Sequence, residues 1–303
     1  MDISPNPRVA VLLMLTASAL IAATTLLAKA LGTDALGPAL HPLQVSHGRF
    51  IFALLALAAA ASILRPKLQR PHWRLHLART TCGWIGVTLM FAASARIALS
   101  DATAISFLNP VFAMILAIPL LGERVGPVRW LAAAIALCGA MVLLRPGPGT
   151  FQPAALIALA SAAVIGFEII LIKRLSGLEN PFQVLLVNNS LGVIIATCAV
   201  IAFWEPPTPA QWAGLAALGT CMACAQACFV NAMARAEASF VVPFSYAALI
   251  FAGLYDAALF GVIPDWVSLS GAGIILSGAA LLAWREAAAA RRSNQNQPPV
   301  RNS

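Results

Sequence analysis

Residues 9–31, VAVLLMLTASALIAATTLLAKAL, decide the fold because they form an almost unbroken apolar stretch in which Lys29 is the only charged residue. Each residue of an α-helix advances the chain by about 1.5 Å, so a stretch of this length crosses the roughly 30 Å hydrocarbon core of a bilayer. Ala17-Ser18-Ala19 has the small residues of a signal-peptidase site, but the apolar stretch continues well past it. We therefore expect an uncleaved first transmembrane helix.

The rest of the chain repeats this pattern. Of its 303 residues, 60% are hydrophobic and 10% are charged, whereas soluble domains carry about 25% charged residues. Nine further stretches are long and apolar enough to span a bilayer: Leu43–Leu64, Leu75–Ile97, Thr103–Leu120, Val128–Leu144, Ala154–Lys173, Phe182–Phe203, Ala210–Asn231, Phe240–Gly261 and Trp266–Trp284. The predicted fold class is an all-α membrane protein with ten transmembrane helices.

Net charge and cysteines exclude two classes of protein. The net charge of +8 comes from basic residues in the short gaps between apolar stretches, without the clustered patch that a nucleic-acid-binding surface needs. The six cysteines lie inside apolar stretches, and the Cys221-x-x-Cys224 pair has no second Cys pair or His beside it. We expect no nucleic-acid partner, no metal and no cofactor; the expected partners are the lipid bilayer and a small-molecule substrate.

Basic residues also predict the topology. If the amino terminus is inside, 15 of the 19 Lys and Arg residues lie on the cytoplasmic side, and only Lys29, Arg49, Arg96 and Arg145 lie elsewhere. This bias predicts that both termini are cytoplasmic. Residues 1–8 then form a short cytoplasmic segment and residues 286–303 a polar, disordered cytoplasmic tail. A bacterial inner membrane is the expected location. The sequence predicts no oligomeric state.

The two halves of the chain are related. Five pairs of motifs recur in the same order at separations of 136 to 144 residues: Lys29 and Lys173, Pro42-Leu43-Gln44 and Pro181-Phe182-Gln183, Asp101-Ala102-Thr103 and Glu237-Ala238-Ser239, Val111-Phe112-Ala113 and Ile250-Phe251-Ala252, and Gly139-Ala140 and Gly278-Ala279. The repeats are residues 9–144 and 154–285. Because each has five helices, an odd number, they cross the membrane in opposite directions, as in secondary transporters with a substrate site at the midplane.

The sequence resembles the drug/metabolite transporter superfamily, specifically proteins with tandem EamA domains. The resemblance covers residues 9–285 and depends on five features: Arg49, Ala102–Pro110, Leu120-Leu121-Gly122-Glu123-Arg124, Gly139 and Gly278. It is greatest to YddG-type amino-acid exporters, which implies a ten-helix carrier that exports amino acids. The second repeat departs from the pattern, with Gly261-Val262 in place of Gly122-Glu123. The resemblance therefore implies no function for a carboxylate at this turn of the second repeat.

Five titratable residues fall at bilayer depth, where a charge at the centre costs roughly 2.5 to 3.5 kcal/mol. Glu168 is either an acceptor for an ammonium group or proton, or a partner of a basic residue on a neighbouring helix. Lys29 and Arg49 lie near the outer helix ends, so their side chains are expected to reach the headgroups or to serve gating. Asp256 is placed to pair with either, and His47 is a proton site or a hydrogen-bonded helix-end residue.

Uncharged polar side chains are better material for a substrate site, because they orient a ligand without a large desolvation cost. The candidates are Asn109, Gln226, Asn231, Ser245 and Tyr246, with apolar walls from Trp84, Met90 and Tyr255. For each one singly, packing or bonding between helices is the commoner role. Three prolines, Pro110, Pro119 and Pro243, interrupt the fourth and ninth helices and are candidate hinges or static kinks.

The predicted function is a secondary transporter that exports amino acids, aromatic or neutral ones included, or similar small metabolites by alternating access. A carrier of nucleotide sugars or cationic drugs with the same fold is the alternative, and an integral membrane enzyme acting on lipid is the third reading. The chain has no Gly-x-x-x-x-Gly-Lys-Ser/Thr loop, Gly-x-Ser-x-Gly or His-Glu-x-x-His motif. No catalytic residues are expected.

Overall fold

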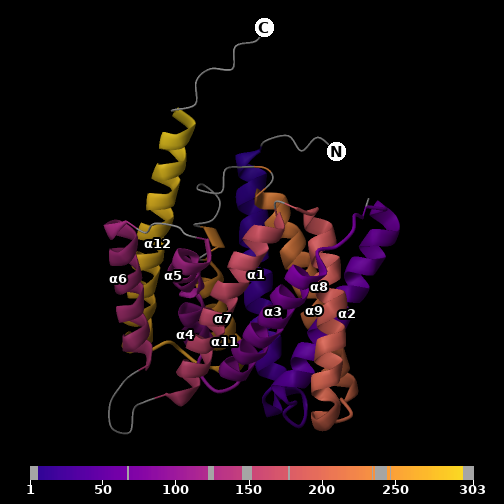
Figure 1. The fold of residues 1–303 in the computed structure, drawn as a ribbon. Helices are drawn as coiled ribbons and strands as arrows, with labels where there is room; N and C mark the ends of the chain where they lie inside the picture. The colour runs from indigo at the N-terminus through magenta and orange to yellow at the C-terminus, as the bar shows by residue number, and fades with distance from the viewer. Residues whose placement is uncertain are drawn as a thin grey trace.

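The computed structural model describes residues 6–66, 68–121, 126–144, 152–176, 178–233, 235, 244–245 and 247–295. Within these ranges the chain is helical and contains no strand. The helices run up and down as one bundle, and the start of α1 and the end of α12 lie at the same end of it (Figure 1). We call this the terminal end, and the opposite one, where α1 ends and α2 begins, the far end.

The helices follow the predicted segments closely. Their bounds are α1 (Pro7–Leu31), α2 (Pro42–Leu64), α3 (Trp73–Ser94), α4 (Leu99–Ser106), α5 (Asn109–Leu121), α6 (Pro127–Leu144), α7 (Pro153–Ser176), α8 (Pro181–Val200), α9 (Pro209–Met233), α11 (Ala247–Phe260) and α12 (Trp266–Gln295), with 3₁₀ turns η1 (Asp34–Leu36) and η2 (Ile201–Phe203). Six spans among the described residues are long and apolar enough to cross a membrane.

Local sequence explains where these helices begin. Proline occupies the first position of α1, α2 and α8, where its missing N–H is not needed. The preceding side chain accepts a hydrogen bond from the helix: Asn6 from the Val9 N–H, and Asn180 from the Phe182 N–H. Such caps satisfy amide groups that have no partner within the helix.

The predicted fourth span, Thr103–Leu120, lies within the apolar span Leu99–Leu120, and the predicted interruption at Pro110 is present in the structure. The span breaks at Phe107 and Leu108 into α4 and α5, with Pro110 as the second residue of α5. Proline cannot donate to the carbonyl four residues earlier and crowds it, which favours a kink or a break of the helix there. α4 ends at Ser106, which is the residue four positions before Pro110. Pro119, by contrast, lies inside α5 without breaking it.

The bundle exposes many large apolar side chains, and its largely apolar interior also contains charged and polar side chains, which is unusual for a soluble protein. Leu12, Ile63, Ile194 and Leu259 are between 60% and 80% exposed, whereas the buried residues include Lys29, Gln44, Arg49, Arg79 and Asp256. A surface of this kind is stable only in lipid, and buried polar groups there call for partners or a function.

α6 and α12 pack side by side at one edge of the molecule (Figure 1). They approach through glycines: a Cβ on Gly139 would lie 2.7 Å from Gly271 O and Ile275 N, and one on Gly278 would lie 2.7 Å from Ala132 O and Ala136 N. Any larger residue would push the two helices apart. These glycines therefore serve packing.

Two buried glutamines join the halves of the chain at opposite ends of the bundle. At the far end, Gln44 of α2 donates to the Glu205 carbonyl at 2.6 Å and accepts from the Glu205 N–H at 3.2 Å. At the terminal end, Gln183 of α8 accepts from the Gln69 N–H at 2.6 Å. Each glutamine is the third residue of its helix. Gln44 of α2 binds the connection that follows α8, and Gln183 of α8 binds the connection that follows α2.

Candidate functional site

The buried cluster of Arg79, Glu168 and Arg49 lies where helices of both halves meet. Glu168 of α7 rests against Gly83 of α3, where an added Cβ would come within 2.8 Å of its Oε1. The Arg79 Nε, one turn earlier on α3, lies 3.4 Å from the same oxygen, and its Nη1 donates to the Val184 carbonyl at 3.2 Å. Glycine at position 83 thus makes room for a carboxylate in the interior of the bundle.

Arg49 of α2 is the third member of the cluster. Its charge interacts with those of Glu168 and Arg79, yet its Nε and Nη1 are buried without a hydrogen-bond partner. Its guanidinium lies 4.4 Å from the Phe50 ring centre. Arg49 is only 4% exposed, so the expectation that it reaches the headgroups is wrong: the side chain points into the protein, not along the helix to its end.

Of the two readings of Glu168, the pairing with a basic residue of a neighbouring helix is present in the structure. Its partner, Arg79, was missed because it was counted with the charges of the second connection. A usable signal was available, since Arg79 falls inside the predicted span 75–97 and a charge within a span usually faces the interior.

Lys29 and Asp256 form a nearly fully buried ion pair between α1 and α11. Asp256 also accepts from the Leu99 N–H at 2.7 Å, at the start of α4, and the Lys29 ammonium lies 4.6 Å from the Phe260 ring centre. The prediction that Asp256 pairs with a basic residue at the helix ends is confirmed for Lys29. The expectation that Lys29 reaches the headgroups is wrong, because the carboxylate holds it inside.

His47 is a hydrogen-bonded residue near the far end. Its Nε2 lies 3.1 Å from the Thr197 hydroxyl oxygen, which already donates to the Val193 carbonyl. The hydroxyl therefore accepts, and His47 donates from Nε2. The imidazole also meets the Trp204 ring edge to face at 5.7 Å.

The predicted uncharged site residues are only partly brought together. The Trp84 Nε1 and the Gln226 Oε1 are buried without partners, and Gln226 lies two turns along α9 from Gly219, whose Cβ position meets the Arg49 carbonyl. Met90 packs on the apolar core of α4 to α7, and Asn109 begins α5. Two of the other predicted residues contact α1: the Ser245 carbonyl accepts from the Ser18 hydroxyl, and the Tyr255 hydroxyl contacts the Ala19 carbonyl. The Asn231 side chain accepts from Arg235. Tyr246 and Pro243 are outside the described residues.

The cavities found among the described residues do not include the cluster; one of about 410 Å³ is lined by His47, Thr197, Val200, Ile201 and Trp204. Another of about 540 Å³ at the far end is lined by Lys29, residues 95–98, 152–154 and Val262. A third, an apolar groove of about 280 Å³, lies between α2, α8 and α9 and includes Asn231. Apolar lining suits lipid or helix contact; the Arg79–Glu168 cluster is where the polar chemistry lies.

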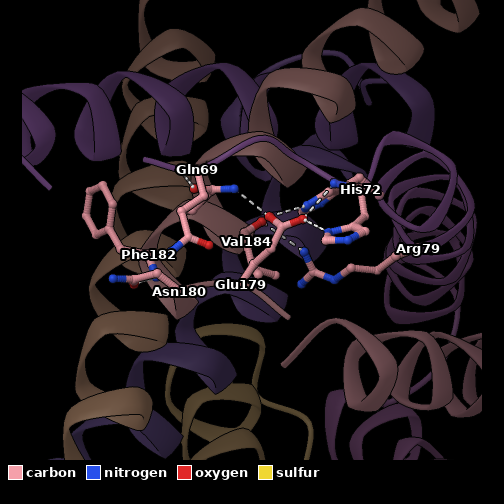
Figure 2. A network of polar contacts seen from close by, with 9 residues as sticks. Gln69, His72, Arg79, Glu179, Asn180, Phe182 and Val184 are labelled. Carbon is pink, nitrogen blue, oxygen red and sulfur yellow. Dashed lines mark hydrogen bonds and ion pairs between the residues drawn. The ribbon is translucent and has the colours of Figure 1, made fainter. Parts of the chain in front are cut away.

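A second polar network closes the terminal end around Glu179, in the connection between α7 and α8 (Figure 2). Its Oε1 accepts from the His72 N–H at 2.7 Å and contacts the His72 Nδ1 at 2.9 Å, and its Oε2 contacts the His76 Nε2 at 2.9 Å. Gln183 donates to Oε2 at 2.6 Å. The network was missed because both histidines lie more than 100 residues from Glu179 in the chain.

Acid should weaken this network. Burial raises the pKa of the Glu179 carboxyl, but hydrogen bonds from the His72 backbone, His76, the His72 side chain and Gln183 outweigh burial and lower the pKa from 4.5 to about 2. A lowered pKa contributes stability that is present above pH 4.5 and is lost as the pH falls toward 2. The thermal stability of the detergent-solubilised wild type should drop more over that window than that of Glu179→Gln. Parallel pH profiles would contradict this.

The sequence is similar to a known family and its members. The model of the EamA-like transporter family matches residues 8–145 and 152–284. A riboflavin transporter of Rhizobium johnstonii is 35% identical over 208 residues, covering 68% of each chain. An S-adenosylmethionine uptake transporter of Rickettsia bellii is 25% identical over 254 residues, covering 83% of this chain and 87% of that one. A solved crystal structure covers 91% of this chain at 21% identity with a TM-score of 0.62, which supports the fold alone.

Proposed function

The chain belongs to the EamA-like transporter family, and from that premise we propose that it carries metabolites with an amino-acid group, free amino acids included, across the membrane. The observation that carries the proposal is Glu168, a carboxylate in the interior of the bundle with its side chain 14% exposed. A carboxylate at low dielectric is a strong partner for an ammonium group. S-adenosylmethionine, named for the Rickettsia relative, also ends in an α-ammonium and an α-carboxylate.

Alternating access between two inverted five-helix repeats, residues 9–144 and 154–285, is the mechanism we propose. Reciprocal contacts support it. Gly139 meets Gly271 and Ile275, and Gly278 meets Ala132 and Ala136; the pairs 132/271, 136/275 and 139/278 are each 139 residues apart. Gln44 and Gln183 are also 139 residues apart. Gln44 binds the connection after α8 at the far end, and Gln183 binds the connection after α2 at the terminal end. An approximate twofold axis between the halves accounts for both.

The proposed location is a bacterial inner membrane, with the terminal end and both termini in the cytoplasm. The bias of Lys and Arg supports this orientation. Single cysteines placed at Asp34, in η1 at the far end, and at Leu68, in the connection between α2 and α3, should react with membrane-impermeant reagents from opposite sides in a cysteine-free background. Labelling of both positions from one side would contradict the topology.

Purified protein in proteoliposomes tests the substrate class. The labelled compounds are neutral and aromatic L-amino acids, S-adenosylmethionine, riboflavin and UDP-glucose, each assayed in both directions because the predicted export and the uptake named for the Rickettsia relative differ. We expect counterflow of amino acids or S-adenosylmethionine. Riboflavin is the second candidate, favoured by the 35% identity to the Rhizobium protein; movement of riboflavin or UDP-glucose alone would contradict the proposed substrate class.

A further inference from the structure

Arg49 lies at a depth where an unpaired charge is costly. It is the eighth residue of α2, so about 10 Å of helix separates it from the far end. Phe50 beside it packs on Gly192 of α8, and its own carbonyl faces Gly219 of α9. The backbone at Arg49 is therefore held between two helices of the second half. The guanidinium is fixed inside the protein and cannot leave it by a change of rotamer alone.

Among the residues that the structure describes, no acid is left over to balance this guanidinium. Among the described residues, Glu168 is the acid whose charge interacts with Arg49, and Glu168 already forms the ion pair with Arg79. The cluster thus has two positive charges and one negative. Asp256 is held by Lys29 and the Leu99 N–H. The cluster keeps an excess positive charge in the interior, with two N–H-bearing atoms of Arg49, Nε and Nη1, without a partner.

We propose that Arg49 binds the carboxylate of the transported substrate, so that the carrier selects small molecules with a carboxylate group. The inference rests on the proposed function, because it assigns the ligand class of the same cluster. A guanidinium presents planar N–H donors that match a carboxylate, and charge-assisted hydrogen bonds of this kind are strong where water is excluded. The two unpartnered nitrogens of Arg49, Nε and Nη1, match the two oxygens of one carboxylate.

The geometry gives the substrate an orientation. An amino-acid group has its two charges on adjacent positions, and the cluster has a carboxylate, Glu168, beside an unpaired guanidinium, Arg49. The ammonium lies toward Glu168 and the carboxylate toward Arg49. Trp84 and Gln226, whose indole N–H and amide oxygen have no partner among the described residues, are candidates for polar contacts with the rest of the substrate.

Thermal denaturation in detergent tests this assignment without knowledge of the natural substrate. The probes are L-methionine, L-methioninamide, which lacks the carboxylate, sodium propionate, which lacks the ammonium, and propionamide, all at equal ionic strength. Methionine and propionate should raise the Tm of the wild type, and the two amides should not. Arg49→Gln should remove the difference between acid and amide, Arg49→Lys should retain part of it, and Arg70→Gln, at an exposed arginine between α2 and α3, should behave as wild type.

Transport assays separate the two levels of the proposal. With a carboxylate substrate from the proteoliposome panel, Arg49→Gln should lower transport on the order of tenfold or more, mainly through KM, and Arg70→Gln should not. Equal stabilisation by acids and amides, or unchanged transport in Arg49→Gln, would overturn the carboxylate site and leave the transport function standing. A wild type that moves none of the panel but is stabilised by propionate through Arg49 would overturn the proposed function and leave the anion site standing.

Discussion

Glu168→Gln is expected to abolish most transport. A second substitution, Arg79→Gln, which restores the net charge of the cluster, is expected not to restore transport. Glu168→Gln keeps the size of the side chain but removes the negative charge that faces Arg79 at 3.4 Å. Removing one partner of a buried ion pair typically destabilises a protein by about 3 to 5 kcal/mol. The single variant should therefore lose both stability and activity, and by itself it does not separate the two roles of Glu168.

The double variant Glu168→Gln/Arg79→Gln separates them. It removes one positive and one negative charge, so the cluster keeps the same net charge as the wild type. We expect its Tm to recover most of the loss, and its transport in proteoliposomes to stay below about one-tenth of the wild-type rate, since the acceptor for the ammonium is still missing. Recovery of both properties together would show that Glu168 acts only as the partner of Arg79.

Asp256→Asn is expected to be among the most destabilising conservative substitutions in the chain. Asparagine can still accept from the Leu99 N–H, so the variant removes only the charge that balances the buried ammonium of Lys29. The expected loss is about 3 to 5 kcal/mol, measured by denaturation in detergent. Asp34→Asn, at an exposed position in η1, should stay within about 0.5 kcal/mol of the wild type.

The double variant Lys29→Met/Asp256→Leu is the control for that pair. Replacing both partners of a buried ion pair by apolar residues of similar size is often neutral or stabilising. Stability should therefore return close to the wild-type value, less the hydrogen bond to Leu99. A double variant as unstable as Asp256→Asn would show that the packing around α4, and not the ion pair, carries the effect.

The sequence predicted the spans well because hydrophobicity alone sets them. The predicted segment 9–31 corresponds to α1, Pro7–Leu31, and 43–64 to α2, Pro42–Leu64. The interruption of the fourth span has a local cause: Pro110 cannot donate a hydrogen bond to the Ser106 carbonyl, and α4 ends at Ser106. Apolar content alone does not distinguish a kink from a break.

Polar partners were harder to predict, because they depend on how each helix is rotated and which helices are neighbours. Asp256 and Lys29 lie 227 residues apart, and only the shared depth of the two charges pointed to their pairing. Arg79 was counted with the charges of a connection although it falls inside the predicted span 75–97, and Glu179 lies between two predicted spans, where charge is ordinary. Gln226 was predicted as a polar site residue and Trp84 as an apolar wall, and only the structure shows that Gln226 Oε1 and Trp84 Nε1 are buried without a hydrogen-bond partner among the described residues.

The carboxylate of Asp256 holds three helices at one point: α11, which carries it, α1 through Lys29, and the first turn of α4 through Leu99. α5, by contrast, packs on α7, where Gly166 meets the Asn109 carbonyl and Phe112. The two parts of the fourth span thus differ in their partners, since α4 packs on both α11 and α7 whereas α5 packs on α7. Any motion of α11 relative to α7 is expected to displace α4 more than α5, so that rotation concentrates in the φ and ψ angles of Phe107 and Leu108.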